Sequence, residues 1–368
     1  MLYIHRTACI SPQRSFPDTE IDLQQLHASA DNKLRAIEPS YEDIPPGLLR
    51  RMGKTVRLGI GAALPLLREA AAPPGGILIG TANAGMEESI QFMKEIIDHE
   101  EGILSPSAFV QSTPNTIAAQ LALLTRNKAY NITHVQGGLA FENALIDAAM
   151  LLRENASDSP PKSAHSPTYL VGAADEIGTH NYNIDRLQGW FKTEPVSSRD
   201  LYMVDSSGSL AGEGAAMFLV NNQKENALAR LEGLATLHTK ERAVVEERLC
   251  SFLDQHLPSG EKIDLLLSGE NGDNRFLHFF SSIEKCLDAR SGRARDAAPA
   301  IARFKHMSGE YPTASAFALW LACQLLGRHS LPPHMIKIPP TKAEFKRVLV
   351  CNSHKGLQHS FMLVSTGN

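Results

Sequence analysis

The sequence predicts an α/β fold in which helices cover both faces of a sheet. Strand-like and helix-like segments alternate along all 368 residues, and such alternation is typical of α/β proteins. The strand-like segments are short apolar runs such as 76–80, as expected for buried strands. Two helical segments rich in Ala and Gly, 137–152 and 313–327, occupy equivalent late positions in the two parts of the chain. We therefore predict two pseudo-repeated halves, 1–230 and 231–368.

The first half begins with a half-alternating strand over 2–10 and a helix over 45–71, which Pro73 and Pro74 end. A buried strand over 76–80 and a polar turn follow. The further elements are helices over 86–104 and 114–127, a strand over 129–133, a helix from the following bend to about 154, a Ser/Pro-rich loop over 155–168, and strands over 169–176 and 212–222.

The second half repeats this alternation. Its predicted elements are a strand over 227–239, a helix over 240–257, a strand leading into a polar turn over 263–274, helices over 275–287 and 313–328, and strands over 347–353 and 359–365. The helix over 313–328 is mostly apolar, which predicts a central, buried position.

Composition excludes several classes of protein. Hydrophobic residues make up 43% of the chain and charged residues 21%, as in soluble globular proteins with a large core. The net charge of −4 shows no nucleic-acid footprint. The first residues lack a secretory signal, and no apolar stretch approaches the roughly 20 residues of a membrane span. We expect a cytoplasmic protein that binds no nucleic acid.

Cysteines and the common ligand motifs give no sign of a disulfide framework, a metal site or a cofactor. The five cysteines are scattered singly, at positions 9, 250, 286, 323 and 351, which favours reduced thiols. The chain has no phosphate-binding loop and no zinc-binding helix motif. The glycines at 59–61 are interpreted as helix packing. We expect neither a metal nor a cofactor.

The segment 131–152, NITHVQGGLAFENALIDAAMLL, holds a glycine-rich bend that runs straight into a helix. A helix N-terminus stabilises negative charge, so such bends often carry a nucleophile. This bend contains no Cys or Ser, but His134, Val135 and Gln136. It is therefore either an unusual active site, a site without its chemistry, or only a turn.

The order of several motifs resembles the β-ketoacyl synthases, condensing enzymes of fatty-acid and polyketide synthesis. The GEGAA turn (212–216) and the FKHMSGE segment (304–310) are the most specific. The other matching segments are SPSAFVQSTPNTIAAQLAL (105–123), NITHVQGGLAFENAL (131–145), YLVGAADE (169–176) and VLVCNSHKGLQHSFMLV (348–364). The resemblance spans nearly the whole chain. It implies a thiolase-like fold with five layers, α-β-α-β-α, built from two ketosynthase-like halves.

The family uses a cysteine nucleophile, and the resemblance places a different residue at that position. Val135 takes the position if GGL is matched to the family's S-G-[LV], and His134 takes it if Ala144 is matched instead. Neither residue offers a thiolate to hold a growing acyl chain.

The family's two catalytic histidines are also replaced. The first position falls near Glu270 and Asn271, and the second falls on Glu310, while the family's lysine remains as Lys305. An ionised glutamate only accepts hydrogen bonds and would repel a developing enolate. We therefore expect Lys305 to pair with Glu310 or Glu270 in a structural salt bridge.

The resemblance extends to chain length factors, which keep the ketosynthase fold, lack the cysteine and carry a Q-A-G-G-L bend. VQGGL (135–139) is similar to that bend, with the glutamine displaced by one position. Several segments look closest to ketosynthase-like proteins of bacterial aryl-polyene and flexirubin clusters. This implies a non-condensing subunit that forms a heterodimer with a cysteine-bearing ketosynthase and works with an acyl carrier protein.

The same resemblance implies a set of tunnel and interface residues. They are Phe109, Val110, Gln111, Thr113, Pro114, Gln136, Phe141 and His354. His354 takes the position of a gatekeeping phenylalanine, and Lys355 takes that of a glycine. Loss of the glycine predicts a stiffer loop.

Two other functions stay open at the level of sequence. The chain could be an acyltransferase of the 3-oxoacyl synthase class that uses His134 as nucleophile or base. It could also be a module that binds acyl carrier protein or an acyl chain, with Arg50, Arg51 and Lys54 as a basic contact cluster.

Overall fold

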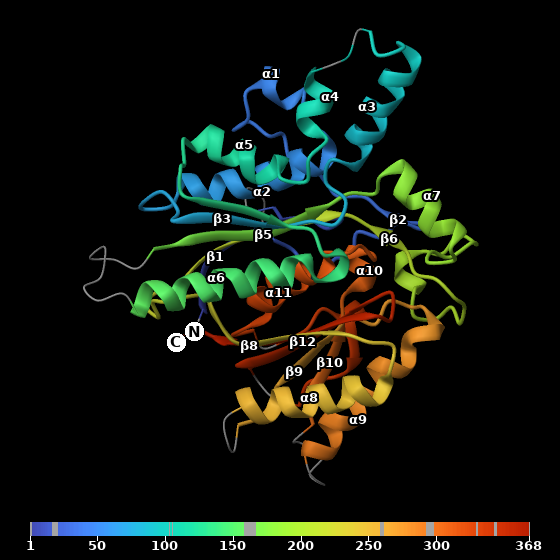
Figure 1. Cartoon of the computed structure of the whole chain (residues 1–368). Helices are drawn as coiled ribbons and strands as arrows, with labels where there is room; N and C mark the ends of the chain where they lie inside the picture. The colour runs from blue at the N-terminus through green and yellow to red at the C-terminus, as the bar shows by residue number, and fades with distance from the viewer. Residues whose placement is uncertain are drawn as a thin grey trace.

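The computed structural model describes residues 2–16, 21–102, 104, 106–157, 167–257, 261–291, 298–328, 330–341 and 344–367. Its helices and sheets stack in five layers, α-β-α-β-α, from top to bottom in Figure 1. This is the architecture that the resemblance implies. No helix in the described ranges is both long and apolar enough to cross a membrane.

The upper sheet has the strand order β4-β3-β5-β7-β1. Its strands are β1 (Leu2–Ile10), β3 (Gly76–Gly80), β4 (Tyr130–His134), β5 (Tyr169–Asp175) and β7 (Gly214–Asn221). β3 pairs in parallel with β4 and β5, whereas β7 runs antiparallel to β5 and β1. β3, β5 and β7 are buried along their whole length, as expected for strands covered on both faces.

The lower sheet has the strand order β11-β10-β9-β12-β13-β8. Its strands are β8 (Ala229–His238), β9 (Leu265–Ser268), β10 (Ala300–Arg303), β11 (Ile336–Ile338), β12 (Arg347–His354) and β13 (Gln358–Thr366). β9 pairs in parallel with β10 and β12, whereas β13 runs antiparallel to β12 and β8.

The two sheets therefore repeat one topology. When the strands of each sheet are numbered along the chain, leaving out β11, they lie in the order third, second, fourth, fifth, first. The parallel and antiparallel pairings are also the same in both sheets, and β11 is an addition at one edge. β1 and β8 also pair with each other through Leu2–Ile4 and Ala229–Leu231, so the upper and lower sheets are joined into one continuous sheet. This symmetry is in keeping with two pseudo-repeated halves; the boundary proposed between 230 and 231 falls just inside β8, the first strand of the second repeat.

The helices form the three other layers. They are α1 (Pro46–Leu49), α2 (Lys54–Arg68), α3 (Met86–Asp98), α4 (Pro106–Gln111), α5 (Thr116–Thr125), α6 (Ala140–Ser157), α7 (Thr179–Leu187), α8 (Arg242–His256), α9 (Leu277–Ser291), α10 (Lys305–Ser308) and α11 (Ala314–Leu325). A two-stranded sheet of β2 (Lys33–Leu34) and β6 (Ala211–Gly212) lies beside them.

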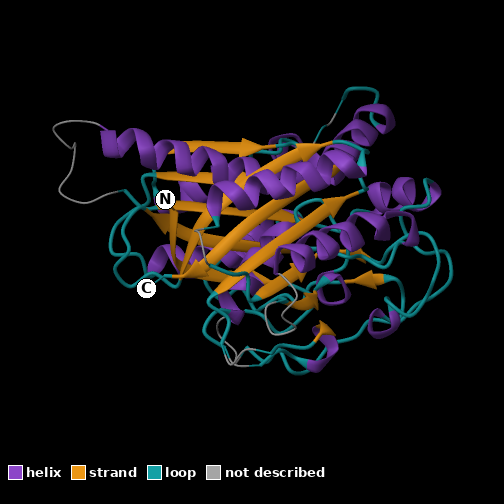
Figure 2. Ribbon diagram, turned by 90° about the horizontal axis from the view of Figure 1, so that it is seen from below, coloured by secondary structure: helices purple, strands orange, loops and turns teal. Residues whose placement is uncertain are grey.

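The middle layer consists of α6 and α11, which lie between the two sheets (Figure 1). Figure 2 shows the same layers from below, one in front of another. These helices occupy equivalent places, since α6 follows β4 and α11 follows β10. The largest hydrophobic cluster contains Phe141 of α6, Trp320 of α11 and inward side chains of both sheets. Separate clusters lie under α2 and α5 on one side and under α8 and α9 on the other. The predicted burial of 313–328 is therefore confirmed.

Several predicted boundaries were wrong. The helix predicted over 45–71 is two helices, α1 and α2, because the extended backbone at Gly53 separates them. The helix predicted over 86–104 ends at Asp98, and residue 103 lies outside the described residues. Most of the predicted loop 155–168 also lies outside them. The glycines at 59–61 do pack closely: a Cβ at Gly59 would lie 2.8 Å from Ile117 of α5.

Candidate functional site

The glycine-rich bend connects β4 to α6, as the sequence predicts. After His134 the chain passes through Val135 and Gln136 into a 3₁₀ turn, Gly137–Leu139, and then α6. Gly137 has a φ of 58°, which favours glycine. The side chain of Val135 is 46% exposed, so it does not point into a closed catalytic cavity of this chain.

The bend is tied to the hairpin between β12 and β13. The Gly138 amide donates a hydrogen bond to Gln358 Oε1 at 2.7 Å, and Gln358 Nε2 donates one to the Gln136 carbonyl at 3.1 Å. A Cβ at Gly138 would lie 2.4 to 2.8 Å from the His354 side chain. Gly138 is therefore required by the close approach of His354, which fills the space in front of the bend.

Behind His354 lies a buried ion pair. Lys305, at the start of α10, is fully buried, and its Nζ donates to Glu310 Oε1 at 3.1 Å. The predicted pairing of Lys305 with one of two glutamates is therefore confirmed for Glu310. The GEGAA turn supports this pair: Gly212 donates its amide to the Glu310 carbonyl, and a Cβ at Gly212 would lie 2.1 Å from the Ser308 carbonyl oxygen.

Glu310 is held in its ionised form by its neighbours. Burial alone would raise its pKa, but the charge of Lys305 and hydrogen bonds from His354 and Asn271 outweigh that effect and lower the pKa to about 2. Asn271 Nδ2 lies 3.0 Å from Glu310 Oε2, and His354 Nδ1 lies 3.3 Å from Glu310 Oε1. Burial also lowers the pKa of Lys305, although Glu310 opposes this. Glu310, which the resemblance matches to the second histidine, is thus a carboxylate that accepts three hydrogen bonds.

Glu270 does not reach this cluster. It accepts hydrogen bonds from Arg303 Nη1 at 3.2 Å and Lys337 Nζ at 2.6 Å, and Lys337 also binds Glu284. Of the two residues near the first histidine position, Asn271 is the one that turns toward Lys305 and Glu310.

Sequence reasoning missed a second buried acid, Glu142 of α6. Both its oxygens are buried, and neither has a partner of full hydrogen-bond geometry among the described residues. Burial raises the pKa of Glu142; the nearby hydroxyls of Ser360 and Ser315 and the charge of Lys305 oppose this. The sequence did hold one sign of this buried acid: Glu142 lies three residues before Leu145, on the same face of the predicted helix, and α6 buries that face.

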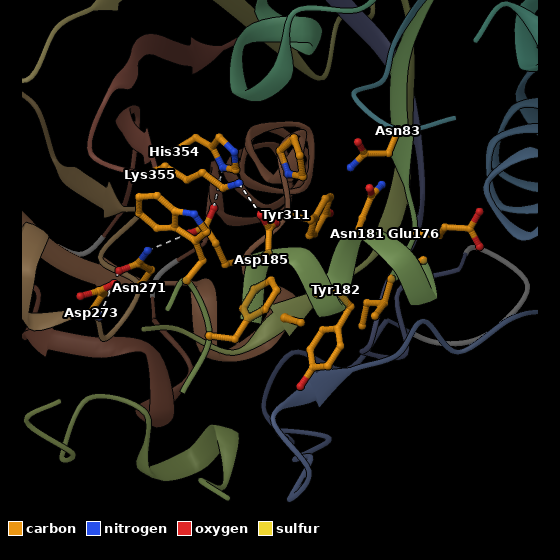
Figure 3. A pocket seen from close by; sticks show the side chains of 18 of the residues that line it. Asn83, Glu176, Asn181, Tyr182, Asp185, Asn271, Asp273, Tyr311, His354 and Lys355 are labelled. Carbon is orange, nitrogen blue, oxygen red and sulfur yellow. Dashed lines mark hydrogen bonds and ion pairs between the residues drawn. The ribbon is translucent and has the colours of Figure 1, made fainter. Parts of the chain in front are cut away.

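A small pocket opens from this cluster toward the surface (Figure 3). Asn271, His354 and Lys355 gather at one end of it, and Asn83 and Glu176 lie at the other. The cavity volume is about 40 Å³, which accommodates a few water molecules. An acyl chain could not enter without movement of the wall.

Charged and aromatic side chains line this pocket near His354. Lys355 Nζ donates to Asp185 Oδ1 of α7 at 2.7 Å and lies 5.2 Å from the centre of the Trp190 ring. The Arg275 guanidinium lies 5.1 Å from the same ring. Lys355, where the resemblance expects glycine, has a φ of 54°. We name the contact between Lys355, Asp185 and Trp190 the latch.

His134 faces another part of the molecule. Its Nε2 lies 3.0 Å from Asp147 Oδ2 of α6, and the Tyr130 hydroxyl donates to the same carboxylate oxygen at 3.0 Å. No contact of His134 with Lys305 or Glu310 is seen among the described residues. The structure therefore separates His134 from the other family catalytic positions.

The predicted tunnel residues have mixed environments. On α4, Phe109 and Val110 are exposed, whereas Gln111 is buried and hydrogen-bonds the backbone at Arg51 and Gly53. Thr113 and Pro114 are exposed. Phe141 is fully buried against Phe218, with ring centres 5.6 Å apart.

The basic cluster expected from Arg50, Arg51 and Lys54 does not form as three free cations. Lys54 Nζ donates to Glu213, which is fully buried, at 2.5 Å. Glu213 also accepts the amides of Ala36 and Ile177. Lys54 therefore holds the GEGAA turn in place. Across the described ranges, no group of three or more His, Cys, Asp or Glu side chains is arranged to bind a metal ion.

Comparison with known proteins agrees with the motifs. Residues 24–159 match a family model described as the N-terminal domain of beta-ketoacyl synthase. No curated protein matches the sequence significantly. Three similar solved structures illustrate the fold. The ishigamide ketosynthase/chain length factor has 14% identity and a TM-score of 0.74, with 99% of this chain and 98% of that chain covered.

A type II polyketide synthase acyl carrier protein in complex with its ketosynthase (AntDE:AntF) has 13% identity and a TM-score of 0.76, with 99% of each chain covered. The ketosynthase ApeO in complex with its chain length factor ApeC, from Xenorhabdus doucetiae, has 16% identity and a TM-score of 0.72, with 99% of this chain and 98% of that chain covered. The resemblance to the β-ketoacyl synthases is therefore confirmed: residues 24–159 match the N-terminal domain of that family, and the chain as a whole has the ketosynthase fold.

Proposed function

We propose that this chain is a non-condensing, chain-length-factor-like subunit that pairs with a cysteine-bearing β-ketoacyl synthase. The observation that carries the proposal is the Lys305–Glu310 ion pair, buried behind a bend that has no thiol. Decarboxylative condensation needs a nucleophile and hydrogen-bond donors for the enolate. Here the bend offers an exposed valine, and the donors of Lys305, Asn271 and His354 are all engaged by the Glu310 carboxylate.

The surface around β4 supports a partner subunit. β4 is the last strand of the sheet, so one of its edges has no strand partner among the described residues. Exposed apolar side chains occur on this strand and on the two helices that contact it: Tyr130 on β4, Val135 directly after it, Leu123 on α5 and Met150 on α6. An unpaired edge strand with apolar flanks favours pairing with another chain. Two of the similar structures are described as a ketosynthase with a chain length factor, which favours a ketosynthase as that chain.

We further propose that the pair acts on substrates carried by an acyl carrier protein, in fatty-acid or polyketide synthesis of the aryl-polyene or flexirubin type. The support is the ketosynthase fold, together with the carrier-protein complex among the similar structures and the ApeO–ApeC complex.

Co-expression with a cysteine-bearing ketosynthase encoded beside this chain tests the pairing. A 1:1 complex is expected in size-exclusion chromatography with light scattering. Leu123→Arg should break the complex while the circular dichroism of the isolated chain stays unchanged. Leu187→Arg, an equally exposed leucine on α7, is the matched control and should leave it intact. A homodimer that ignores every such partner, or a complex indifferent to Leu123→Arg, would refute the proposal.

A second candidate is an enzyme that uses His134, and the observation that favours it is the His134–Asp147 pair. A carboxylate bound to one ring nitrogen orients an imidazole for base catalysis. The test is to incubate the chain with acyl and malonyl carrier protein and to weigh chain and product by mass spectrometry. Turnover that His134→Ala abolishes would establish this function in place of the first. If neither a covalent adduct nor a product forms, this second function is excluded.

A further inference from the structure

Two cysteines that are far apart in the sequence face each other in the outer layer of the second half. Cys250 on α8 and Cys286 on α9 have their Sγ atoms 3.1 Å apart, and both thiols are free. Both residues are partly exposed. The sequence shows them only as single cysteines 36 positions apart, so the fold alone brings them together.

The two helices hold this register firmly. One turn further along, Arg290 of α9 donates to Asp254 of α8 at 2.7 Å, so the two contacts lie side by side along the helix pair. Beneath them, buried apolar side chains of both helices form one core cluster, among them Leu249, Leu253, Ile283 and Leu287. The packing of this layer therefore keeps the two backbones that carry the thiols at this spacing.

We propose that Cys250 and Cys286 form a reversible disulfide site, oxidised by a hydroperoxide. This inference does not depend on the proposed function, because it concerns a helix pair on the far side of the lower sheet from the Lys305–Glu310 cluster. Disulfide closure needs two sulfur atoms within reach and side chains on backbones that can stay in place, and the register supplies both.

The reaction proceeds in two balanced steps. In the first, the sulfur of one cysteine attacks a peroxide oxygen, the O–O bond breaks, and a sulfenic acid forms while water leaves. In the second, the other sulfur attacks the sulfenic sulfur, the S–S bond forms, the S–O bond breaks, and a second water leaves. Two thiols thus lose two electrons and two protons, and hydrogen peroxide becomes two molecules of water.

The proximity of the two thiols makes the second step fast. Their sulfur atoms lie 3.1 Å apart and both residues are partly exposed, so either thiol can meet the peroxide first. The other thiol then resolves the sulfenic acid, with the short distance between the sulfur atoms replacing intrinsic reactivity.

The test uses the full chain. It is treated with hydrogen peroxide, its remaining thiols are blocked with N-ethylmaleimide, and its peptides are mapped by mass spectrometry. We expect one cross-linked peptide pair that joins Cys250 to Cys286 and disappears with dithiothreitol, while the other three cysteines stay alkylated. Full alkylation of both residues, at a peroxide dose that oxidises glutathione in the same tube, would overturn the proposal. So would a cross-link from either residue to another cysteine.

Two serine variants then test the sulfenic acid intermediate. In Cys286→Ser and in Cys250→Ser, the cysteine that remains has no partner, so its sulfenic acid should persist and be trapped by dimedone. If dimedone traps neither variant, the proposal is contradicted. Cys323→Ser, a substitution on α11, is the control and should leave the cross-link unchanged.

Discussion

At the scale of single residues, the Lys305–Glu310 pair is the most consequential feature, because both charges lie away from water. Removing one partner of a buried pair leaves an uncompensated charge, which costs about 3–5 kcal/mol. Glu310→Gln should therefore lower the free energy of unfolding by about that amount in urea denaturation. The double variant Lys305→Met/Glu310→Gln should recover most of it. If the single variant is as stable as the wild type, the pair is not the buried contact described.

The low pKa of Glu310 also determines how acid changes the stability of the fold. Its pKa is lowered from 4.5 to about 2 in the folded chain. Ionised Glu310 therefore contributes to folding stability above pH 4.5, and this contribution is lost as the pH falls toward 2. Glu142 has the opposite sign, because burial raises its pKa in the folded chain. Protonated Glu142 therefore contributes to folding stability below pH 4.5, and this contribution is lost as the pH rises.

Glu142→Gln isolates the second effect. Glutamine keeps the shape of a protonated glutamate and cannot ionise, so the variant should gain melting temperature relative to the wild type as the pH is raised from about 5 to 8. Parallel thermal scans across that range measure the difference. Glu154→Gln, near the end of the same helix, is the control and should show no such trend. A constant difference at all pH values would mean that Glu142 does not titrate in this range.

At the scale of elements, the turn between β12 and β13 carries Lys355 where the resemblance implies a glycine. The latch ties this turn to α7, and Lys355 adopts a backbone conformation that costs a non-glycine residue roughly 1–2 kcal/mol. Lys355→Gly and Lys355→Ala both remove the ion pair, but only glycine relieves the strain. Urea denaturation should show the glycine variant as the more stable by about 1 kcal/mol. Equal stabilities would show that the turn is not strained.

The elements also show what the sequence could predict. The alternating pattern identified most strands and the central helix 313–328, because burial on both faces leaves long apolar runs. It missed α7, whose side chains are mostly polar, and β10, which has only four residues. At the site, the motif order located Lys305 but left two glutamates as its partner. The choice depends on the loop after β9, which turns Asn271 toward Glu310 and leaves Glu270 with Arg303 and Lys337.

At the scale of the whole molecule, the repeated topology does not make the halves independent. The largest core cluster draws on both halves, with Phe141 and Phe218 on one side and Trp320 and Met362 on the other. Each half alone would expose the inner face of its sheet and one side of its middle helix. A repeat that shares its core in this way is expected to unfold with its neighbour rather than separately.

Expression of the halves tests this dependence. Fragments 1–230 and 231–368 should each be aggregated or lack near-ultraviolet circular dichroism when produced singly, because each exposes a large apolar surface. When co-expressed they should associate, since the cut falls within β8 and the middle layer draws on both fragments. The intact chain should give one calorimetric transition whose calorimetric and van't Hoff enthalpies agree. A fragment that folds alone with a cooperative transition of its own would show that the shared middle layer is not needed to hold that half together.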